Sequence, residues 1–240
     1  MQSGEILSQE GNRVWASQVI RRFDPDFRFI WEHYHAEILA ILNPKMVWLD
    51  IGSGKNSQIS EFGVKARFAA GLDLESPAQK IDSPFVAGAL PSLPFKTESA
   101  DLLTLHFVVE HLQNISAHFT EIFRVLKPGG KLILVTTNTW SPYILAARCF
   151  PFFLKNFLIR SIYRVDAEDV FPTFHAFNTP EKFKESGLYS PHRLIKLLFL
   201  QDVNYERKWL FWLFFAGHLL TRRKMGFLRT NLLGVFEKSS

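Results

Sequence analysis

The chain has 240 residues and a mass of 27.7 kDa, which is long enough to bury a sizeable core without disulfides or a structural metal. With 47% apolar and 21% charged residues, the composition excludes disordered, collagen-like and low-complexity chains. The net charge of +5 is unevenly divided, because residues 1–138 carry −2 while residues 139–240 carry +7 and 14 of the 24 phenylalanines. That basic, aromatic half suits either an anionic membrane surface or lipid-like ligand, or a phenylalanine-rich core with solvated basic faces.

No targeting or membrane-spanning segment is expected. The first thirty residues lack a run of seven apolar residues and carry several charges, which excludes a secretory signal. No stretch reaches the roughly 18 uncharged apolar residues that a membrane-spanning helix needs, since three basic residues interrupt the apolar region around residue 150. The single cysteine, Cys149, excludes an internal disulfide or a cysteine-built zinc site. These features predict a cytoplasmic chain, either free or peripheral on a membrane surface.

Helix and strand signals alternate along the chain. Residues 27–42 place apolar side chains three and four apart before an Asn-Pro breaker, which predicts an amphipathic helix with Trp31 and Tyr34 in the core. Apolar runs that predict strands lie at residues 46–52, 66–74, 100–107, 131–137, 192–200 and 231–238. Strands separated by crossovers imply a parallel sheet covered on both faces, and the final strand is expected to close it antiparallel.

The first predicted strand ends in a glycine turn. Gly52 and Gly54 let the backbone approach a ligand closely, and a following helix would point free amides toward it. A Walker phosphate loop is excluded because the lysine after Gly54 is followed by Asn56 instead of Ser or Thr. The dinucleotide fingerprint is excluded because its third glycine would fall at Ser57.

Asp73 ends the next predicted strand, 21 residues after Gly52. In nucleotide-binding α/β units a carboxylate meets the ribose hydroxyls at a spacing of about 20 residues. The turn and Asp73 together predict a nucleoside ligand. The alternatives are a helix N-cap before Ser76-Pro77 for Asp73, and a turn-stabilising acid for Asp50.

Further motifs follow in order. They are the Leu93-Pro94-Phe95 stretch, a strand from Asp101, the Glu110-His111 pair and the turn Leu126-Lys127-Pro128-Gly129-Gly130. With the glycine turn they make residues 45–138 resemble the class I S-adenosylmethionine-dependent methyltransferases, in particular the type 11 group. The resemblance implies a doubly wound α/β domain with a mostly parallel, seven-stranded, Rossmann-like sheet. It implies one domain over residues 1–240, with a cofactor-binding half at 45–138, a helical lid at 141–180, and C-terminal strands with an apolar helix at 181–240.

The resemblance also implies S-adenosyl-L-methionine as the cofactor. The residues expected at the cofactor are Asp50, Gly52, Ser53 and Gly54 for its amino acid part, Asp73 for the ribose, and Leu74, Gly88, Ala89, Leu90 and His106 around the adenine and the cleft. Two positions depart from the family pattern. Ala89 replaces an acid that often meets the adenine amino group, so that contact is lost or taken over by a backbone group. Asn56 replaces the third glycine of the turn. The Leu126–Gly130 turn is expected to be structural only.

Three histidines are candidates for the reacting end of the site. Methyl transfer from a sulfonium is an in-line displacement, so the protein mainly aligns the acceptor, and an oxygen acceptor also needs a base. His106 ends its predicted strand and is either that base or a lining residue. His111 is expected to orient a ligand or to start a helix. His175 competes with His106 as the base, while His33, Tyr34 and His35 lie on the preceding helix.

Residues 141–180 replace a short crossover. In related enzymes such an insertion forms a lid over the acceptor, and the alternative is a self-packed helical excursion. The candidate pocket residues in it are Phe171, Pro172, Phe174, His175, Phe177 and Asn178.

Basic residues bracket the stretch 209–220, whose only polar side chain is His218. A helix apolar nearly all round is buried or in lipid, so residues 207–224 are expected either in the core or at a membrane surface.

The resemblance implies methyl transfer, and the phenylalanine-rich insertion and the helix bracketed by basic residues favour a hydrophobic, membrane-associated small-molecule acceptor, such as a prenylated ring or a lipid-linked precursor. The alternative is a catalytically silent methyltransferase fold that binds another protein. Nucleic acid is not expected as a partner, because no RNA-binding module or base-modifying Asn/Asp-Pro-Pro-Tyr motif is present, and no metal site is indicated.

Overall fold

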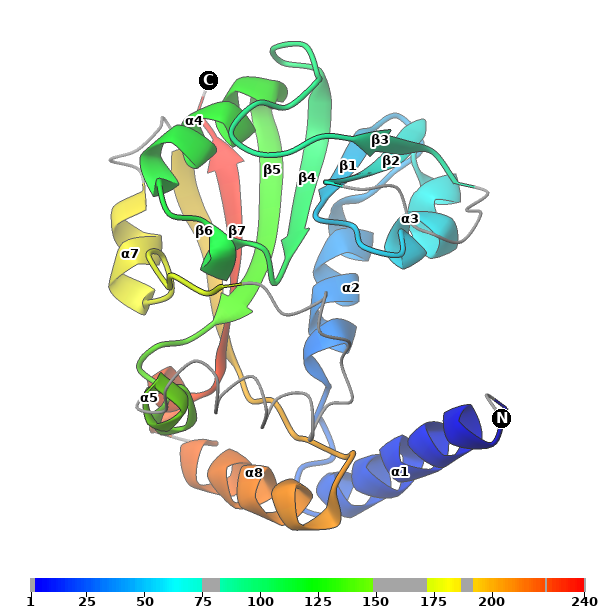
Figure 1. Cartoon of the computed structure of the whole chain (residues 1–240), viewed down its shortest axis with the longest axis vertical. Helices are drawn as coiled ribbons and strands as arrows, with labels where there is room; N and C mark the ends of the chain where they lie inside the picture. The colour runs from blue at the N-terminus through cyan, green and yellow to red at the C-terminus, as the bar shows by residue number, and fades with distance from the viewer. Residues whose placement is uncertain (1–2, 75–82, 149–171, 187–191, 223, 240) are drawn as a thin grey trace. The chain divides into compact units, whose positions relative to one another are not determined.

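The computed structural model describes residues 3–74, 83–148, 172–186, 192–222 and 224–239 (Figure 1). Two compact units make up the chain. The sheet unit comprises residues 34–138, 172–198 and 232–240, and the helical unit comprises residues 1–33, 139–171 and 199–231. Each unit is described separately below.

Within these described ranges, seven strands form one sheet in the order β3-β2-β1-β4-β5-β7-β6. The strands are β1 (Val47–Ile51), β2 (Phe68–Asp73), β3 (Phe85–Ala87), β4 (Ala100–His106), β5 (Leu126–Thr137), β6 (His192–Leu200) and β7 (Asn231–Lys238). The pairs β2·β3, β1·β2, β1·β4 and β4·β5 are parallel, whereas the arrow of β7 points opposite to those of β4 and β5 in Figure 1. The predicted mostly parallel sheet with an antiparallel last strand is therefore confirmed.

The helices occupy the crossovers and the chain ends. They are α1 (Ser3–Arg21), α2 (Ile30–Ile41), α3 (Ser57–Phe62), α4 (Ile115–Val125), α5 (Pro142–Arg148), α7 (Pro180–Glu185) and α8 (Lys208–Thr221), with 3-10 turns η1 (Gly63–Lys65), η2 (Val109–His111) and η5 (Gly226–Leu228). The predicted helix at 27–42 begins only at Ile30, because the carboxylate of Glu32 accepts the Phe29 N–H at 2.7 Å and so caps the first turn. Tyr34 is fully buried as expected, but Trp31 is 38% exposed and stacks on Phe29, so its assignment to the core is wrong.

Both faces of the central sheet are covered. Four consecutive residues of β1, from Trp48 to Ile51, are buried, which a strand achieves only when elements pack on each face. At the other end of the sheet, α4 buries Phe119 and Phe123, and the ring of His192 from β6 stacks on Phe123 at 4.0 Å. A buried aromatic cluster therefore fixes β6 and α4 together.

The predicted turn at 126–130 lies inside β5. Leu126 pairs with Ala100 and Lys131 with Leu102, so the four residues between them bulge out of the ladder. Gly129 adopts φ +73° there, a conformation that glycine accepts without a Cβ clash. The turn joins α4 to the sheet as a bulge within β5.

Asp101 joins three elements at the amino end of the sheet. Its carboxylate accepts the Val47 N–H at 2.8 Å and pairs with the Lys127 ammonium at 2.7 Å. Asp101 therefore ties β1 and the β5 bulge to β4.

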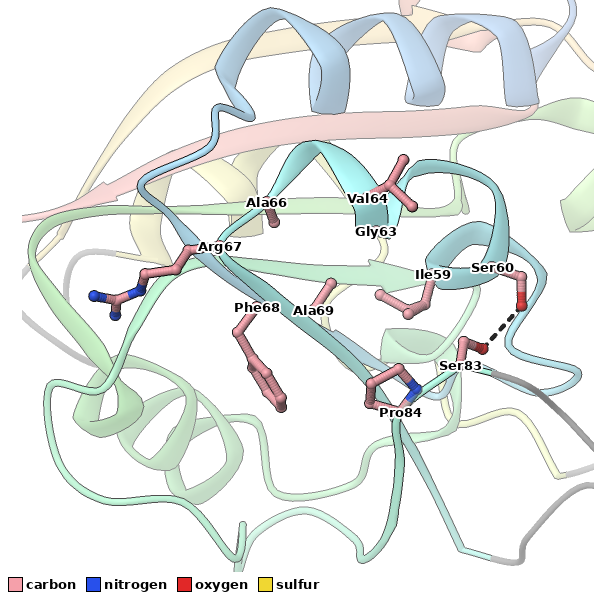
Figure 2. A pocket seen from close by; sticks show the side chains of 10 residues that line it. All are labelled: Ile59, Ser60, Gly63, Val64, Ala66, Arg67, Phe68, Ala69, Ser83 and Pro84. Atoms are coloured by element: carbon pink, nitrogen blue, oxygen red, sulfur yellow. Dashed lines mark hydrogen bonds between the residues drawn. The ribbon is translucent and has the colours of Figure 1, made fainter.

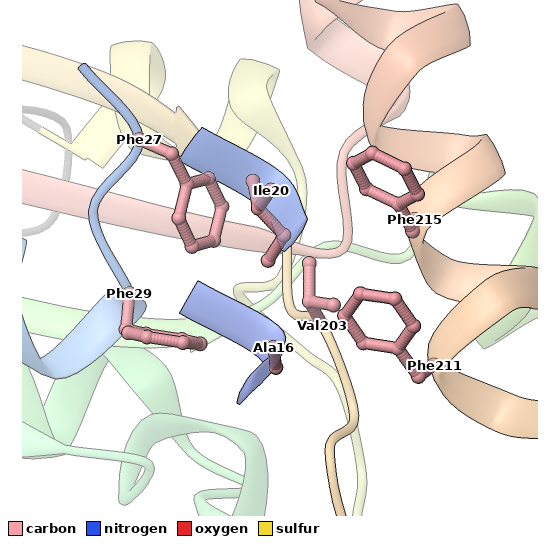
Figure 3. Packing of buried hydrophobic residues seen from close by; sticks show 7 residues of the cluster. All are labelled: Ala16, Ile20, Phe27, Phe29, Val203, Phe211 and Phe215. Atoms are coloured by element: carbon pink, nitrogen blue, oxygen red, sulfur yellow. The ribbon is translucent and has the colours of Figure 1, made fainter. Parts of the chain in front are cut away.

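The helical unit has its own apolar core, shown in Figure 3. Its buried members are Ala16, Ile20, Phe27, Phe29, Val203, Phe211 and Phe215. They come from α1, from the segment after it, from the segment before α8, and from α8 itself. Helix α1 shows no strong apolar periodicity in the sequence, so its stability comes mainly from this packing.

Helix α8 confirms the helix expected at 209–220, but it is neither wholly buried nor wholly exposed. Leu210, Phe211 and Phe215 are buried, whereas Trp209 and Trp212 are 63% and 52% exposed. One face belongs to the core of the helical unit and the other faces solvent. None of the helices in the described ranges combines the length and apolarity that crossing a membrane requires.

Candidate functional site

The glycine turn after β1 has the backbone geometry that a close ligand approach needs. Gly52 and Gly54 adopt φ values of +72° and +51°. A Cβ on Gly52 would lie 2.3 Å from Val108 Cγ2, whereas a Cβ on Gly54 would have no atom within 4 Å. Gly52 is therefore required by the packing beneath the turn, while Gly54 leaves the space above it open.

Asn56 keeps the turn's shape although it replaces the family's glycine. Its φ is +56°, a left-handed conformation that asparagine tolerates better than most residues. The buried side-chain amide donates to Ser83 Oγ at 2.8 Å and to the Pro84 carbonyl at 3.1 Å. Room for it comes from Gly71 of β2, where a Cβ would lie 1.9 Å from Asn56 Oδ1. The surrounding residues thus accommodate asparagine in place of glycine at this position.

Asp73 lies against the glycine turn. Its carboxylate accepts the Gly54 N–H at 2.8 Å and the Leu74 N–H at 2.7 Å. The Gly88 N–H donates to the Asp73 carbonyl at 2.9 Å, which brings the end of β3 to the same edge. Leu74 is mostly exposed beside them. The structure therefore brings the predicted turn, ribose acid and β3 residues together, while Ser76-Pro77, the basis of the alternative for Asp73, lies outside the described residues.

A tight turn follows β3 where the family acid is replaced. The Ser92 N–H donates to the Ala89 carbonyl at 3.0 Å, and Leu90 lies partly buried between them. Ala89 and Ser92 thus form an isolated antiparallel bridge. No acidic side chain stands at this position.

Asp50 is a buried carboxyl held by a chain of hydroxyl and indole donors. The Trp48 indole donates to Thr104 Oγ1 at 2.8 Å, and that hydroxyl donates to Asp50 Oδ1 at 2.6 Å. Burial raises the Asp50 pKa to about 7, the Thr104 hydrogen bond lowers it, and the charge of Asp73 raises it again. Asp50 is therefore poised to change its ionisation near neutral pH.

His106 lies at the carboxyl end of β4, in contact with α2. Its ring packs 4.8 Å from that of Tyr34. Burial, with a smaller contribution from His35, lowers the His106 pKa to about 4, and its Nε2 has no hydrogen-bond partner among the described residues. His106 is uncharged at neutral pH, and a group with so low a pKa is a weak general base there.

A second buried acid lies beside the ends of β4 and β5. Glu110 accepts the Thr136 hydroxyl at 2.7 Å, and burial raises its pKa. Asn178 donates its amide to Thr136 Oγ1 at 2.6 Å and to Thr137 Oγ1 at 3.0 Å. The Glu110 backbone carbonyl accepts the N–H groups of residues 174 and 175. Residues 172–178 are therefore fastened to the sheet edge through side chain and backbone together.

The two remaining histidines belong to this same arrangement. His111 donates from Nδ1 to the Pro172 carbonyl at 2.8 Å, so it ties down the 172–178 segment. The expected helix-start role belongs instead to Asn114, whose side chain accepts the Ala117 N–H. His175, with φ +52°, places Nδ1 3.4 Å from Thr137 Oγ1.

The predicted pocket residues of the insertion divide into three groups. Pro172 and Phe174 are exposed, Phe177 is fully buried against Phe119 and so belongs to the core, and Phe171 lies outside the described residues. The middle of the expected helical lid, residues 149–171, also lies outside them.

Sequence reasoning missed the polar partners inside the strands. Thr104 and Thr136 each interrupt an apolar run, and each bonds a buried carboxyl. Asp50 pairs directly with Thr104 in the β1·β4 register. A hydroxyl residue in a buried strand that neighbours a strand with a buried acid was therefore the sequence signal for these partners.

A cavity of about 430 Å³ lies elsewhere in the sheet unit (Figure 2). Val64, Phe68 and Pro84 line it, at the amino end of β2 and near a hydrogen bond between Ser60 and Ser83. It is thus at the opposite end of β2 from Asp73. Within the described ranges, no group of three or more His, Cys, Asp or Glu side chains is placed to hold a metal ion.

Known proteins resemble the part of the chain that carries the glycine turn and Asp73. Residues 49–134 match the family model described as a methyltransferase domain. A demethylmenaquinone methyltransferase from Beutenbergia cavernae is 29% identical over 118 residues, which cover 46% of this chain and 48% of that protein. The chain spans about half the length of the curated relatives it matches.

Solved structures share the fold at low identity. An S-adenosylmethionine-dependent methyltransferase from Mesorhizobium loti gives a TM-score of 0.55 at 15% identity, over 87% of this chain and 97% of that one. A geranyl diphosphate C-methyltransferase from Streptomyces coelicolor gives 0.54 at 13% identity, over 86% and 74%. The chain therefore has the class I methyltransferase fold. The family model described as a methyltransferase domain matches residues 49–134, just over a third of this chain.

The family match supports S-adenosyl-L-methionine as the cofactor, and the residues present fit it. Two carboxylates, Asp50 and Asp73, suit a ligand that offers ammonium and hydroxyl donors. The open space above Gly54 admits such a ligand beside them.

Proposed function

We propose that this chain transfers the methyl group of S-adenosyl-L-methionine to a hydrophobic acceptor. The observation that carries the proposal is the contact between Asp73 and the Gly54 N–H, which joins the ribose acid to the glycine turn at one sheet edge. The bound cofactor supplies an electrophilic methyl carbon. The chain's own task is to hold the ligand with Asp50 and Asp73 and to align the acceptor.

The acceptor class is proposed as a prenylated ring or a lipid-linked precursor. Support comes from relatives named demethylmenaquinone methyltransferase and from a structural neighbour named geranyl diphosphate C-methyltransferase. A substrate of this kind resides in a bilayer, so the proposal includes peripheral contact with a membrane. Exposed Phe174 and the tied-down 172–178 segment are proposed to border the acceptor.

His175 is the proposed base for an oxygen acceptor, with His106 as a lining residue. His106 has a pKa of about 4, so its ionisation would not shape a rate profile near neutral pH. If His175 is the base, His175→Gln should lower the rate of methyl transfer to an oxygen acceptor and leave the S-adenosyl-L-methionine affinity unchanged. A transfer rate unchanged by His175→Gln would reject this assignment.

Cofactor binding is tested by titration calorimetry with S-adenosyl-L-methionine and with NAD. Asp73→Ala should weaken the S-adenosyl-L-methionine affinity more than about fivefold, because charge-assisted hydrogen bonds to two hydroxyls are lost. The matched control, Asp26→Ala, removes an exposed acid of the helical unit and should leave the affinity unchanged. Equal affinities for Asp73→Ala and the unsubstituted chain would disprove the ribose assignment.

The acceptor is sought by incubating lipid extracts with isotopically labelled methyl donor. Label in the organic phase supports a hydrophobic acceptor, and label confined to the aqueous phase contradicts it. The rival function is a silent fold that binds another protein. Tight cofactor binding with no label transfer to any extract, together with capture of a companion chain, would favour that rival.

A further inference from the structure

Helix α8 has two apolar faces, one packed in the core of the helical unit and the other exposed. Its inner face, with Phe211 and Phe215, packs on α1 in the core shown in Figure 3. His218, the polar residue of the stretch, also lies on the inner side, where its Nε2 meets the Asp24 carboxylate at 3.0 Å. The inner side of α8 therefore contributes buried residues to the core of the helical unit.

The outward face of α8 is exposed and carries no polar side chain. It consists of Trp209, Trp212, Leu213, Ala216, Leu219 and Leu220. These positions follow the three- and four-residue spacing of a single helical stripe. Trp209 is 63% and Leu220 76% exposed, at opposite ends of the stripe. Isolated exposed apolar residues are ordinary, but a contiguous stripe of this kind marks an interaction surface.

Basic side chains stand at both ends of this stripe. Arg207 and Lys208 are exposed at the N-terminus of α8, and Arg222 and Lys224 are exposed after its C-terminus. Positive charge at a helix N-terminus opposes the helix dipole, so the dipole does not account for Arg207 and Lys208. The Lys208 ammonium lies 5.9 Å from the centre of the Trp15 ring, yet both side chains are exposed, and an anionic surface against the outward face would attract them.

The charges also distinguish between a bilayer and a second copy of the chain. Both ends of the stripe are positive, so packing two outward faces together would place like charges side by side in either orientation. Tryptophans with flanking lysines and arginines are instead the composition of helices that lie in a bilayer interface, where the rings enter the headgroup region and the cations meet anionic lipids.

We infer that the outward face of α8, with Arg207, Lys208 and Lys224, is a docking surface for an anionic lipid bilayer. The helix lies in the plane of the interface, with its inner face still packed on α1. The inference names the membrane contact of the proposed function, but it stands on the exposed stripe alone and does not require methyl transfer. An acceptor held in the bilayer would then be near the protein without leaving the lipid.

The test uses the full chain with two kinds of vesicle, phosphatidylcholine alone and phosphatidylcholine mixed with phosphatidylglycerol. We expect co-sedimentation with the mixed vesicles, weakened but not abolished by salt, because screening removes the charge attraction and leaves the apolar insertion. Tryptophan fluorescence should shift to the blue on binding. No binding to either vesicle would overturn the inference.

Variants assign the contact to this face. The double substitution Trp209→Ser and Leu220→Ser should weaken vesicle binding by about tenfold or more, whereas Val64→Ser, which removes an 88% exposed apolar side chain in the sheet unit, should change nothing. Arg207→Glu with Lys208→Glu should weaken it by about fivefold for each basic charge lost, and should leave less salt dependence. Unchanged binding by both double variants would reject the outward face as the contact.

Two further measurements separate the competing explanations. If the unsubstituted chain binds no vesicle but forms a dimer that Trp209→Ser with Leu220→Ser dissociates, a second copy occupies the face and the inference is wrong. Calorimetry with S-adenosyl-L-methionine on the same variants should give unchanged affinity, since none of these residues belongs to the cofactor edge. Failure of the docking surface is therefore distinguishable from failure of the proposed function.

Discussion

Substituting Asp50 by asparagine should reveal how burial of this carboxyl makes stability depend on pH. Asp50 is only 2% exposed, and its pKa rises from 3.8 to about 7 in the folded chain. Below pH 4 the carboxyl is protonated in both folded and unfolded chains. Above pH 7 it is ionised in both, and the folded chain then bears the full cost of the buried charge. The protonated carboxyl therefore contributes to the unfolding free energy at low pH, and this contribution is lost as the pH rises through about 7.

The magnitude follows from the pKa shift. Three pKa units correspond to about 4 kcal/mol of unfolding free energy above pH 7, and about 2.5 kcal/mol of that loss falls between pH 5 and pH 8. Asparagine keeps an acceptor for the Thr104 hydroxyl and removes the charge. The advantage of Asp50→Asn in unfolding free energy should therefore grow by about 2.5 kcal/mol over this pH range.

The assay is urea unfolding of both chains at a series of pH values. Asp202, whose burial raises its pKa to about 6, and Glu110 titrate equally in both, so their contributions cancel in the difference. Asp26→Asn, on the exposed surface, should show no pH-dependent difference. A difference between Asp50→Asn and the unsubstituted chain that stays constant from pH 5 to pH 8 would refute the reasoning.

Three substitutions test other contacts. Gly71→Ala places a Cβ 1.9 Å from Asn56 Oδ1, so it should lower the unfolding free energy in urea by about 1–3 kcal/mol. It should also weaken S-adenosyl-L-methionine binding in calorimetry, and an unchanged affinity would show that β2 does not shape the turn. Asp101→Ala removes the acceptor of the Val47 N–H and the partner of Lys127, and should lower the unfolding free energy by about 1–3 kcal/mol, with the exposed Glu61→Ala as the neutral comparison. Thr136→Val takes the hydroxyl from Glu110, so it should lower the unfolding free energy by about 1–3 kcal/mol in urea. Because burial raises the Glu110 pKa, this cost should shrink as the pH falls and the carboxyl becomes protonated; an unchanged unfolding free energy would show that the hydrogen bond does not stabilise the chain.

The sheet could be predicted because its pattern is local. Buried parallel strands are short apolar runs, and those at 46–52, 66–74, 100–107 and 131–137 correspond to β1, β2, β4 and β5. Helix α1 could not be predicted in this way. Its stabilising contacts, such as those of Ala16 and Ile20 with α8, join segments almost two hundred residues apart in the sequence.

The candidate site was predictable where spacing along strands determines proximity. Asp73 and Gly54 meet because parallel strands end at one edge. The attachment of residues 172–178 was not predictable, since Asn178 reaches Thr136 across a long insertion that carries no periodic signal. Nor does the sequence alone show that His111 ties down Pro172, because a histidine after a glutamate fits several roles.

Asn56 and Gly71 form a size-matched pair beside the glycine turn, where the asparagine precedes α3 and the glycine lies on β2. The asparagine side chain fills the volume that a Cβ at position 71 would need, so neither residue can change without affecting the other. Asn56→Gly combined with Gly71→Ala should therefore be tolerated better than Gly71→Ala alone, since the first change removes the nearer clash, Asn56 Oδ1 at 1.9 Å, and leaves only the Ser53 hydroxyl, at 2.5 Å, to move aside. Related chains with glycine at the position of Asn56 should be free to carry a larger residue at the position of Gly71 on β2. The steric coupling should therefore appear as covariation between these two positions.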